Sequence, residues 1–416
     1  MATEQVNKLE LIVSRLKEVI GLDELKVLLN TKTPHIYWGT APTGRIHIGY
    51  FIPLLKIADF LKAECQVIIL IADMHAILDN LKSTPKLVES RTQYYMEMIT
   101  QILINLKIPI DKLRFVVGSD FQTSSRYTFD LYKLCTQVTE HDAKKGGAEV
   151  VKQSNNPKIS SLIYPLMQAL DEEYLGVDIQ FGGIDQRKIF TLAMEYLPSI
   201  GYKKRIHLMN PMLTSISAKP PITDISLPID NYSSEYIEDL KQITEQLEKG
   251  ISKDIIVSNL SSVIDNITCK EELNSISEQG SSRPATLAEQ KMSSSNTNSK
   301  IDILDSKNDI KKKINSVYCL EGDITFNPLM ELVEMVIFPM TSHLQQTFII
   351  NRAEKYGGPL TYNDYESLKE DFITKKIHPQ DLKFGVFEYL NNFIDPIRQH
   401  FSQDDQKNLV KSAYPA

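Results

Sequence analysis

Two short segments carry residue types that could hold a phosphate group. Residues 42–50 read PTGRIHIGY and residues 291–295 read KMSSS. In the first segment, His47 is a side-chain donor beside a turn and a helix start, where free backbone N–H groups attract an anion. In the second, Lys291 is a cation within a run of hydroxyl-bearing residues. Each segment alone is a weak signal, but together they predict two walls of one phosphate site.

Alternating strands and helices surround the first segment. The apolar run at 35–39 predicts a strand that enters a helix at about 48–62, and the run at 66–71 is typical of a strand buried on both faces. Asp73 and His75 follow that second strand at its carboxyl end, where open α/β sheets place ligands. Further strands are predicted at 113–117 and 177–181, and further helices at 85–106, 125–153 and 160–175. The pattern predicts an α/β fold with a Rossmann-like doubly wound parallel sheet and a helical insertion.

The composition changes after residue 213. Residues 214–290 are rich in Ser, Ile, Asn, Glu and Lys, which predicts an amphipathic helical hairpin or, alternatively, a disordered charged loop. Beyond residue 301 the pattern is mostly helical. The predicted organisation is an N-terminal helical segment at 1–34, a Rossmann-like catalytic domain at 35–213 with a helical insertion at about 120–160, an insert at 214–288, a catalytic loop at 289–305 and a C-terminal α-helical domain at 306–416.

Size and composition indicate an ordinary globular protein. The 416 residues, 42% hydrophobic and 24% charged, allow two or three domains, and no apolar run approaches the roughly 18 residues that a membrane span requires. The four cysteines lie far apart, which favours reduced thiols in the cytoplasm and neither a metal site nor a disulfide framework. The net charge of −7 does not exclude nucleic acid, because binding requires only a local basic patch.

The two segments resemble the two signatures of class I aminoacyl-tRNA synthetases. The residues between them resemble the tyrosyl-tRNA synthetases of eukaryotes and archaea, at 37–39, 72–76, 164–174, 180–190 and 207–211. The resemblance covers about 35–213 and 289–400 and omits the insert. Tyr50 departs from the general class signature, which has a second histidine there, and the insert ends directly at the lysine loop. We therefore expect the insert to modulate loop closure or tRNA access.

The resemblance implies a two-step reaction. Tyrosine and ATP form tyrosyl-adenylate and pyrophosphate, and tyrosine is then transferred to the 3′ end of tRNA(Tyr). Because the carboxylate of the amino acid attacks the α-phosphate, the enzyme supplies no nucleophile, and catalysis depends on positioning and charge stabilisation. Mg²⁺ is expected with ATP, bound mainly through phosphate oxygens, without a metal site made by the protein.

The resemblance also implies which residues form the site. The catalytic set is His47, Gly49, Tyr50, Lys291, Ser293 and Ser294. The ATP-binding set consists of Gly39, Thr40, His47, Gly49 and Lys291 together with Gly182, Gly183 and Asp185 under the adenosine and Leu208 and Met209 at the adenine edge. The tyrosine-binding set is Tyr37 and Asp171 at the phenol, Tyr164, Gln168 and Gln186 around the ammonium group, and Gly39 and Asp73. The positions 164, 168 and 171 also share one face of one helix by their spacing alone.

Further partners follow from family analogy. Tyr356 and Asp381 match the positions that contact the first anticodon base, by stacking and hydrogen bonding. Residues 125–153 are expected to serve the acceptor stem and the interface of a homodimer.

Three alternatives stay open. A tryptophanyl-tRNA synthetase has the same fold and both signatures, although Tyr37 and Asp171 favour a phenol over an indole N–H. A small-molecule adenylyl- or cytidylyltransferase has a similar His-containing turn. The third alternative is a non-catalytic RNA-binding descendant of the fold. For Tyr37, simple packing is also an interpretation, since the chain has 18 tyrosines.

Overall fold

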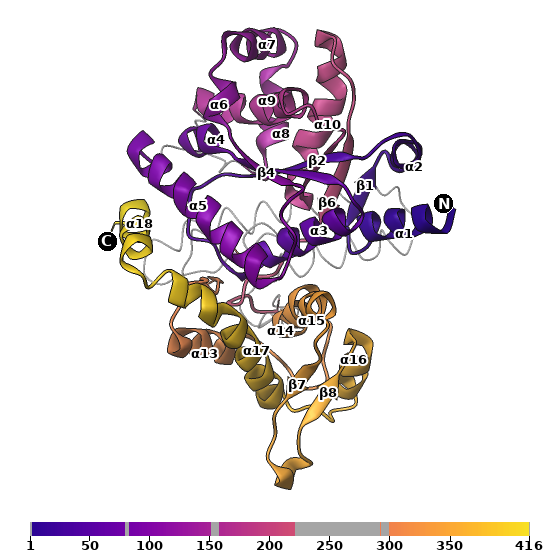
Figure 1. Cartoon of the computed structure of the whole chain (residues 1–416), viewed down its shortest axis with the longest axis vertical. Coiled ribbons are helices and arrows are strands. Elements are labelled where there is room, and N and C mark those ends of the chain that lie inside the picture. The colour runs from indigo at the N-terminus through magenta and orange to yellow at the C-terminus, as the bar shows by residue number, and fades with distance from the viewer. Residues whose placement is uncertain (1, 80–82, 151–157, 221–291, 293–298, 416) are drawn as a thin grey trace, which may run out of the picture. The chain divides into compact units, whose positions relative to one another are not determined.

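A six-stranded sheet forms the centre of the described protein. The computed structural model describes residues 2–79, 83–150, 158–220, 292 and 299–415. The strand order is β1-β6-β5-β2-β3-β4 (Figure 1). The strands are β1 (Glu18–Ile20), β2 (His35–Thr40), β3 (Gln66–Ile71), β4 (Leu113–Val117), β5 (Ile179–Gly183) and β6 (Ile206–Asn210).

The strand order creates a switch point between β2 and β5. From β2 the chain builds outward through β3 and β4, and then returns to the other side of β2 for β5 and β6. All neighbours among these five strands are parallel, and only β1 runs antiparallel, beside β6. Ligands of open α/β sheets bind outside the carboxyl ends of the strands at this point. Here those ends are Thr40 on β2 and Gly183 on β5.

Helices cover both faces of the sheet. Alternate side chains of β2 and β3, such as Trp38 and Ile69, belong to the hydrophobic core shared with α3 (Phe51–Lys62) and α5 (Pro85–Asn105). Tyr37 and Leu70 point to the other face, as expected for successive residues in a strand. In Figure 1 the helices between β3 and β6, apart from α5, lie toward that other face. They are α4 (Asp73–Leu78), α6 (Ser119–Gln122), α7 (Ser125–Cys135), α8 (Glu140–Gly147), α9 (Ile159–Tyr174) and α10 (Arg187–Tyr196).

The C-terminal region is mainly helical and continues the first core. Phe393 packs its ring at 89° against the ring of Phe51, with 5.4 Å between centroids, and the buried apolar cluster runs through both regions. The helices are α13 (Lys307–Ser316), α14 (Pro328–Leu332), α15 (Phe338–Leu344), α16 (Tyr365–Ile373), α17 (Pro379–His400) and α18 (Asp404–Ala413), with a π-helical turn at Val333–Ile337. A hairpin of β7 (Phe348–Ile350) and β8 (Leu360–Tyr362) interrupts them.

Most elements expected from the sequence are present, with some corrections. The strands at 35–40, 66–71 and 113–117 are confirmed, and the strand expected at 177–181 begins two residues later. The expectation of a purely helical N-terminal segment is corrected, because β1 lies between α1 (Ala2–Val13) and α2 (Leu22–Thr31). β1 has only three residues, which is too short for the alternation of apolar and polar residues that marks a strand in a sequence. Its strand conformation depends on pairing with β6. The predicted hairpin in the 214–288 insert lies outside the described residues, and the domain boundaries stay predictions.

Candidate active site

A cavity of about 340 Å³ lies at the switch point. Its walls come from the carboxyl ends of β2 and β5, the turn before α3, and helix α9. The sequence-predicted residues that line it are Tyr37, Gly39, Thr40, His47, Gly49, Tyr50, Tyr164, Gln168, Asp171, Gly182, Gly183, Asp185 and Gln186. The fold therefore brings one group of predicted residues, drawn from four separate parts of the chain, into a single cavity.

His47 is a neutral donor at the turn. Its side chain is buried, and burial, with a smaller effect from Lys300, lowers the pKa of His47 to about 3. Nδ1 accepts a hydrogen bond from the backbone N–H of Gly49 at 3.2 Å. A neutral ring that accepts at Nδ1 carries its proton on Nε2, so Nε2 is the donor that His47 can offer to a ligand.

Tyr50 is tied into the wall of the cavity. Its hydroxyl lies 3.3 Å from the hydroxyls of both Thr40 and Tyr95, and Tyr95 donates to the carbonyl of Gly44 at 2.6 Å. These bonds hold β2, the turn and α5 together. The expected role of Tyr50 as a catalytic donor therefore competes with a structural role that the sequence did not show.

Two glycines at the end of β5 lie where neighbouring side chains leave no room for a Cβ atom. A Cβ atom on Gly182 would lie 2.6 Å from Oε1 of Gln186 and 2.8 Å from Cζ of Phe190. A Cβ on Gly183 would collide with the carboxylate of Asp185. A flat group such as a nucleoside can approach the backbone closely only where such side chains are missing.

Asp171 forms the polar end of the cavity. Its Oδ1 accepts hydrogen bonds of 2.8 Å from Gln122 Nε2 and from the Tyr127 hydroxyl, while Oδ2 has no hydrogen-bond partner among the described residues. Burial raises the pKa of Asp171 to about 8, although Gln122 and Tyr127 act in the opposite direction. The buried Tyr37 hydroxyl reaches the carbonyl of Gln168 at 3.4 Å. This end of the cavity combines a carboxyl oxygen with a phenol, which suits a ligand hydroxyl.

His75 is a second buried polar group at this end. Its Nε2 lies 4.0 Å from Oδ2 of Asp171, and its ring meets the Tyr164 ring edge-to-face at 4.6 Å. Burial lowers the pKa of His75 to about 4, so the ring is neutral near pH 7. It lines the cavity. The sequence correctly predicted that His75 follows the carboxyl end of β3, but it indicated no role for this residue.

One face of α9 supplies the other polar residues, as its spacing predicted. Gln168 donates from Nε2 to Oε1 of Gln186 at 2.8 Å, which joins α9 to the turn after β5. The next residue in the helix after Asp171, Glu172, points away from the cavity and contacts His207 on β6 at 2.6 Å. Glu172 and His207 are both fully buried, so their contact anchors α9 to the sheet. Nothing in the sequence indicated it.

Three expected ligand residues do not line the cavity. Oδ1 of Asp73 accepts from the backbone N–H groups of Met74 at 2.9 Å and Ser119 at 2.8 Å, so its carboxylate joins the starts of α4 and α6. Leu208 and Met209 are fully buried within β6. The residues that follow them, 210–213, line the cavity in their place.

The remaining predicted residues lie elsewhere. Lys291, Ser293 and Ser294 are outside the described residues, although Met292 between them lines the cavity and donates its N–H to Leu213 O at 2.9 Å. Tyr356, 60% exposed, lies in the turn between β7 and β8, and Asp381 lies in the first turn of α17. Within the described ranges, no group of three His, Cys, Asp or Glu side chains could hold a metal ion, and no helix is long and apolar enough to cross a membrane.

The doubly wound fold, its switch-point cavity and the His47 turn define the class. The chain belongs to the family of class I tRNA synthetases for tryptophan and tyrosine, whose family model matches residues 29–219 and 282–395.

The relatives point to the tyrosine branch. The chain is 43% identical over 408 residues to the cytoplasmic tyrosine–tRNA ligase of Gallus gallus, covering 98% of this chain and 63% of the relative, so it spans less than two thirds of that protein's length. It is 39% identical to the probable cytoplasmic tyrosine–tRNA ligase of Encephalitozoon cuniculi, and the match covers all of both chains. The crystal structure of the Archaeoglobus fulgidus tyrosyl-tRNA synthetase complexed with L-tyrosine, 29% identical, matches with a TM-score of 0.70 over 95% of this chain and 99% of that one.

Proposed function

We propose that this chain activates tyrosine with ATP to give tyrosyl-adenylate and pyrophosphate, and then transfers tyrosine to the 3′ end of tRNA(Tyr). The observation that carries the proposal is the polar end of the cavity. There Asp171 presents an oxygen without a hydrogen-bond partner among the described residues, beside Tyr37, on the fold of this family. The names of the relatives, which are tyrosine–tRNA ligases, support the same substrate.

The cavity supports selection of a phenol. A tyrosine hydroxyl can donate to Oδ2 of Asp171 and accept from Tyr37. Phenylalanine would leave Oδ2 of Asp171 buried without a hydrogen-bond partner, which costs its desolvation without any return. Gln122 and Tyr127 hold Oδ1, so Oδ2 is the oxygen that remains for the substrate.

The phosphate end supports catalysis by positioning. His47 is neutral and donates from Nε2, so the site can stabilise charge on the phosphates without a proton transfer. Gly182 and Gly183 line the cavity with backbone alone, which lets the adenosine approach the end of β5 closely. Lys291, as a cation near the leaving pyrophosphate, stays a prediction. Magnesium enters with ATP through phosphate oxygens.

The partners belong to the same proposal. The C-terminal region reads the tRNA anticodon with Tyr356 and Asp381. The helical insertion exposes large apolar side chains, with Phe129 62%, Tyr132 63% and Ile159 75% exposed, which supports a homodimer interface on this part of the surface. We place the protein in the cytoplasm, as the names of its relatives do.

One assay separates the candidate functions. ATP–pyrophosphate exchange is measured with tyrosine, tryptophan and phenylalanine in parallel. We expect exchange with tyrosine alone. Exchange with tryptophan would establish the other branch of the family, and exchange with none would favour a non-catalytic RNA-binding protein. Charging of tRNA(Tyr) in a second assay then tests the transfer step.

A further inference from the structure

The His47 turn is paired with a segment more than 250 positions later in the chain. Ile48 N donates to Ile301 O at 3.0 Å, and Ile303 N donates to Ile46 O at 3.2 Å. The two segments therefore run antiparallel, with His47 opposite Asp302. The position of His47 thus depends on what fixes the segment around Asp302.

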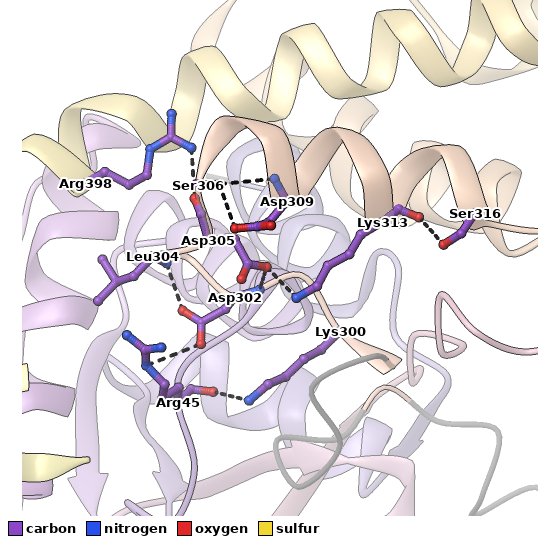
Figure 2. A network of polar contacts seen from close by, with 10 residues as sticks. All are labelled: Arg45, Lys300, Asp302, Leu304, Asp305, Ser306, Asp309, Lys313, Ser316 and Arg398. Atoms are coloured by element: carbon purple, nitrogen blue, oxygen red, sulfur yellow. Dashed lines mark hydrogen bonds and ion pairs between the residues drawn. The ribbon is translucent and has the colours of Figure 1, made fainter. Parts of the chain in front are cut away.

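Asp302 is a buried carboxylate that shapes this segment. It is 4% exposed. Its Oδ1 accepts from Leu304 N at 2.8 Å, and its Oδ2 lies 3.5 Å from Arg45 Nε, two residues before His47 (Figure 2). Lys300 adds a bond of 3.2 Å from Nζ to the carbonyl of Arg45. Side chains therefore reinforce the backbone pairing from both flanks.

Asp305 joins this segment to the C-terminal helices. Its Oδ2 accepts both the backbone N–H of Asp302 at 2.8 Å and Lys313 Nζ of α13 at 2.6 Å. Its carbonyl accepts from Arg398 of α17 at 3.1 Å. Figure 2 shows the two cations approaching Asp305 from different helices. One residue thus connects the partner segment of His47 to two helices.

A hydrogen bond joins those two helices, and contacts within α17 hold Arg398 in place. Lys383, near the start of α17, donates from Nζ to the carbonyl of Asn315, near the end of α13, at 2.8 Å. Near the end of α17, Arg398 is held by Asn391 and Asp395 at 2.7 Å each. The pair of helices is therefore a firm support for Asp305.

We propose that Asp305, held by Lys313 and Arg398, is a positioning residue for His47. It fixes the Asp302 segment against α13 and α17, and the backbone pairing transmits this position to the catalytic turn. The inference rests on the proposed function for its kinetic consequence. Because catalysis here depends on placing donors, a small displacement of His47 lowers the rate of adenylate formation. Among the described contacts, Asp171 of α9 at the phenol end is held by Gln122 and Tyr127 and not by this network, so we expect that end to keep its affinity for tyrosine.

The variant Lys313→Met tests the proposal, with Lys312→Met as the matched control. Both remove one lysine from α13, but Lys312 is exposed and is absent from the Asp305 contacts. In ATP–pyrophosphate exchange with tyrosine, Lys313→Met should lower kcat about tenfold and leave the tyrosine KM within about twofold, while Lys312→Met leaves both unchanged. An unchanged kcat, or a matching change in the tyrosine KM, would overturn the proposal.

A second readout does not depend on activity. Hydrogen exchange of the Ile48 and Ile303 amides, which make the backbone pairing, should be faster in Lys313→Met than in wild type and in Lys312→Met. Equal protection in all three proteins would refute the positioning role even if the proposed reaction were absent. Conversely, the wild-type protein could give no ATP–pyrophosphate exchange with tyrosine while hydrogen exchange of the two amides changes as expected. In that case only the proposed function fails.

A double-mutant cycle assigns the effect to the Asp305–Lys313 contact. Asp305→Ala combined with Lys313→Met should be no slower than the slower single variant, because both remove the same support. Additive losses in kcat would show that the two residues act separately and would contradict the inference.

Discussion

Replacing Asp171 with asparagine should stabilise the ligand-free protein at neutral and alkaline pH. Asparagine keeps an acceptor for Gln122 and Tyr127 and has nearly the same shape. Burial makes the carboxyl keep its proton in the folded chain up to about pH 8 while it ionises in the unfolded chain, whereas the amide ionises in neither. The free energy of unfolding of the two proteins should therefore diverge as the pH rises.

The sign and size of the divergence follow from the pKa of Asp171. In the unfolded chain this carboxyl ionises near pH 3.8, but in the folded chain its pKa is about 8. Between these values the unfolded state binds fewer protons, so this group lowers stability as the pH increases. At about 1.4 kcal/mol for each pH unit, Asp171→Asn should gain on the order of 4 kcal/mol over wild type between pH 5 and pH 8.

Urea denaturation at several pH values from 5 to 9 measures this difference. Asp120→Asn, which removes an exposed carboxylate from nearby α6, is the control for the loss of one charge. Parallel stability curves for wild type and Asp171→Asn across this range would refute the argument that burial dominates at Asp171. In the exchange assay the same variant should raise the tyrosine KM by roughly 10- to 100-fold, because an amide nitrogen replaces one carboxyl oxygen, and a buried polar group left without its partner costs about 1–3 kcal/mol.

Three further predictions concern other parts of the site. Gly182→Ala should destabilise the protein by about 1–3 kcal/mol and weaken ATP binding, because the new methyl would meet Gln186; thermal unfolding and the ATP KM measure this. Glu172→Ala should cost about 1–3 kcal/mol in urea denaturation, since it leaves His207 buried without its hydrogen-bond partner. His47→Asn should lower kcat by the same factor at every pH from 6 to 8, because the pKa of His47 is about 3 and the ring stays neutral there.

Matched variants separate these effects from general damage. Gly39→Ala should be milder than Gly182→Ala, because the nearest atom to its new Cβ is 3.6 Å away. Glu173→Ala, which removes a partly exposed partner of Arg205, should cost less than Glu172→Ala. A control variant that is as damaging as its test variant would contradict the corresponding prediction. The prediction for His47 would be contradicted if kcat of the wild type showed an ionisation step near pH 7 that His47→Asn abolishes.

Sequence patterns could predict those parts of the site that lie on one local element. The strand–turn–helix around His47 has a local signature of apolar periods and turn residues, and the spacing of Tyr164, Gln168 and Asp171 repeats once per helical turn. The structure places all four in one cavity. Their assigned roles in binding tyrosine and ATP stay predictions.

Other contacts could not be predicted because no local period encodes them. Tyr127 lies 44 positions before Asp171, in the helical stretch at 125–153 that was expected to serve the acceptor stem and the dimer interface, yet its hydroxyl holds that carboxyl. Asp73 follows the end of a strand, where a ligand residue is expected. However, the packing of α6 places a backbone N–H donor against its carboxylate. Which partner a polar side chain meets depends on the helix that packs beside it.

The sequence by itself determined the strand–helix alternation, the His47 turn and the polar face of α9, because these depend on residues within a few positions of one another. Tertiary structure alone decided how strongly Asp171 is desolvated, which of its oxygens remains for a ligand, and that the segment at 301–303 supports His47. Burial and pairing across the sheet depend on the strand order and on helices distant in the chain. The physical reason is that desolvation and long-range hydrogen bonds are properties of the packed surroundings of a residue, and not of the residues beside it in the chain.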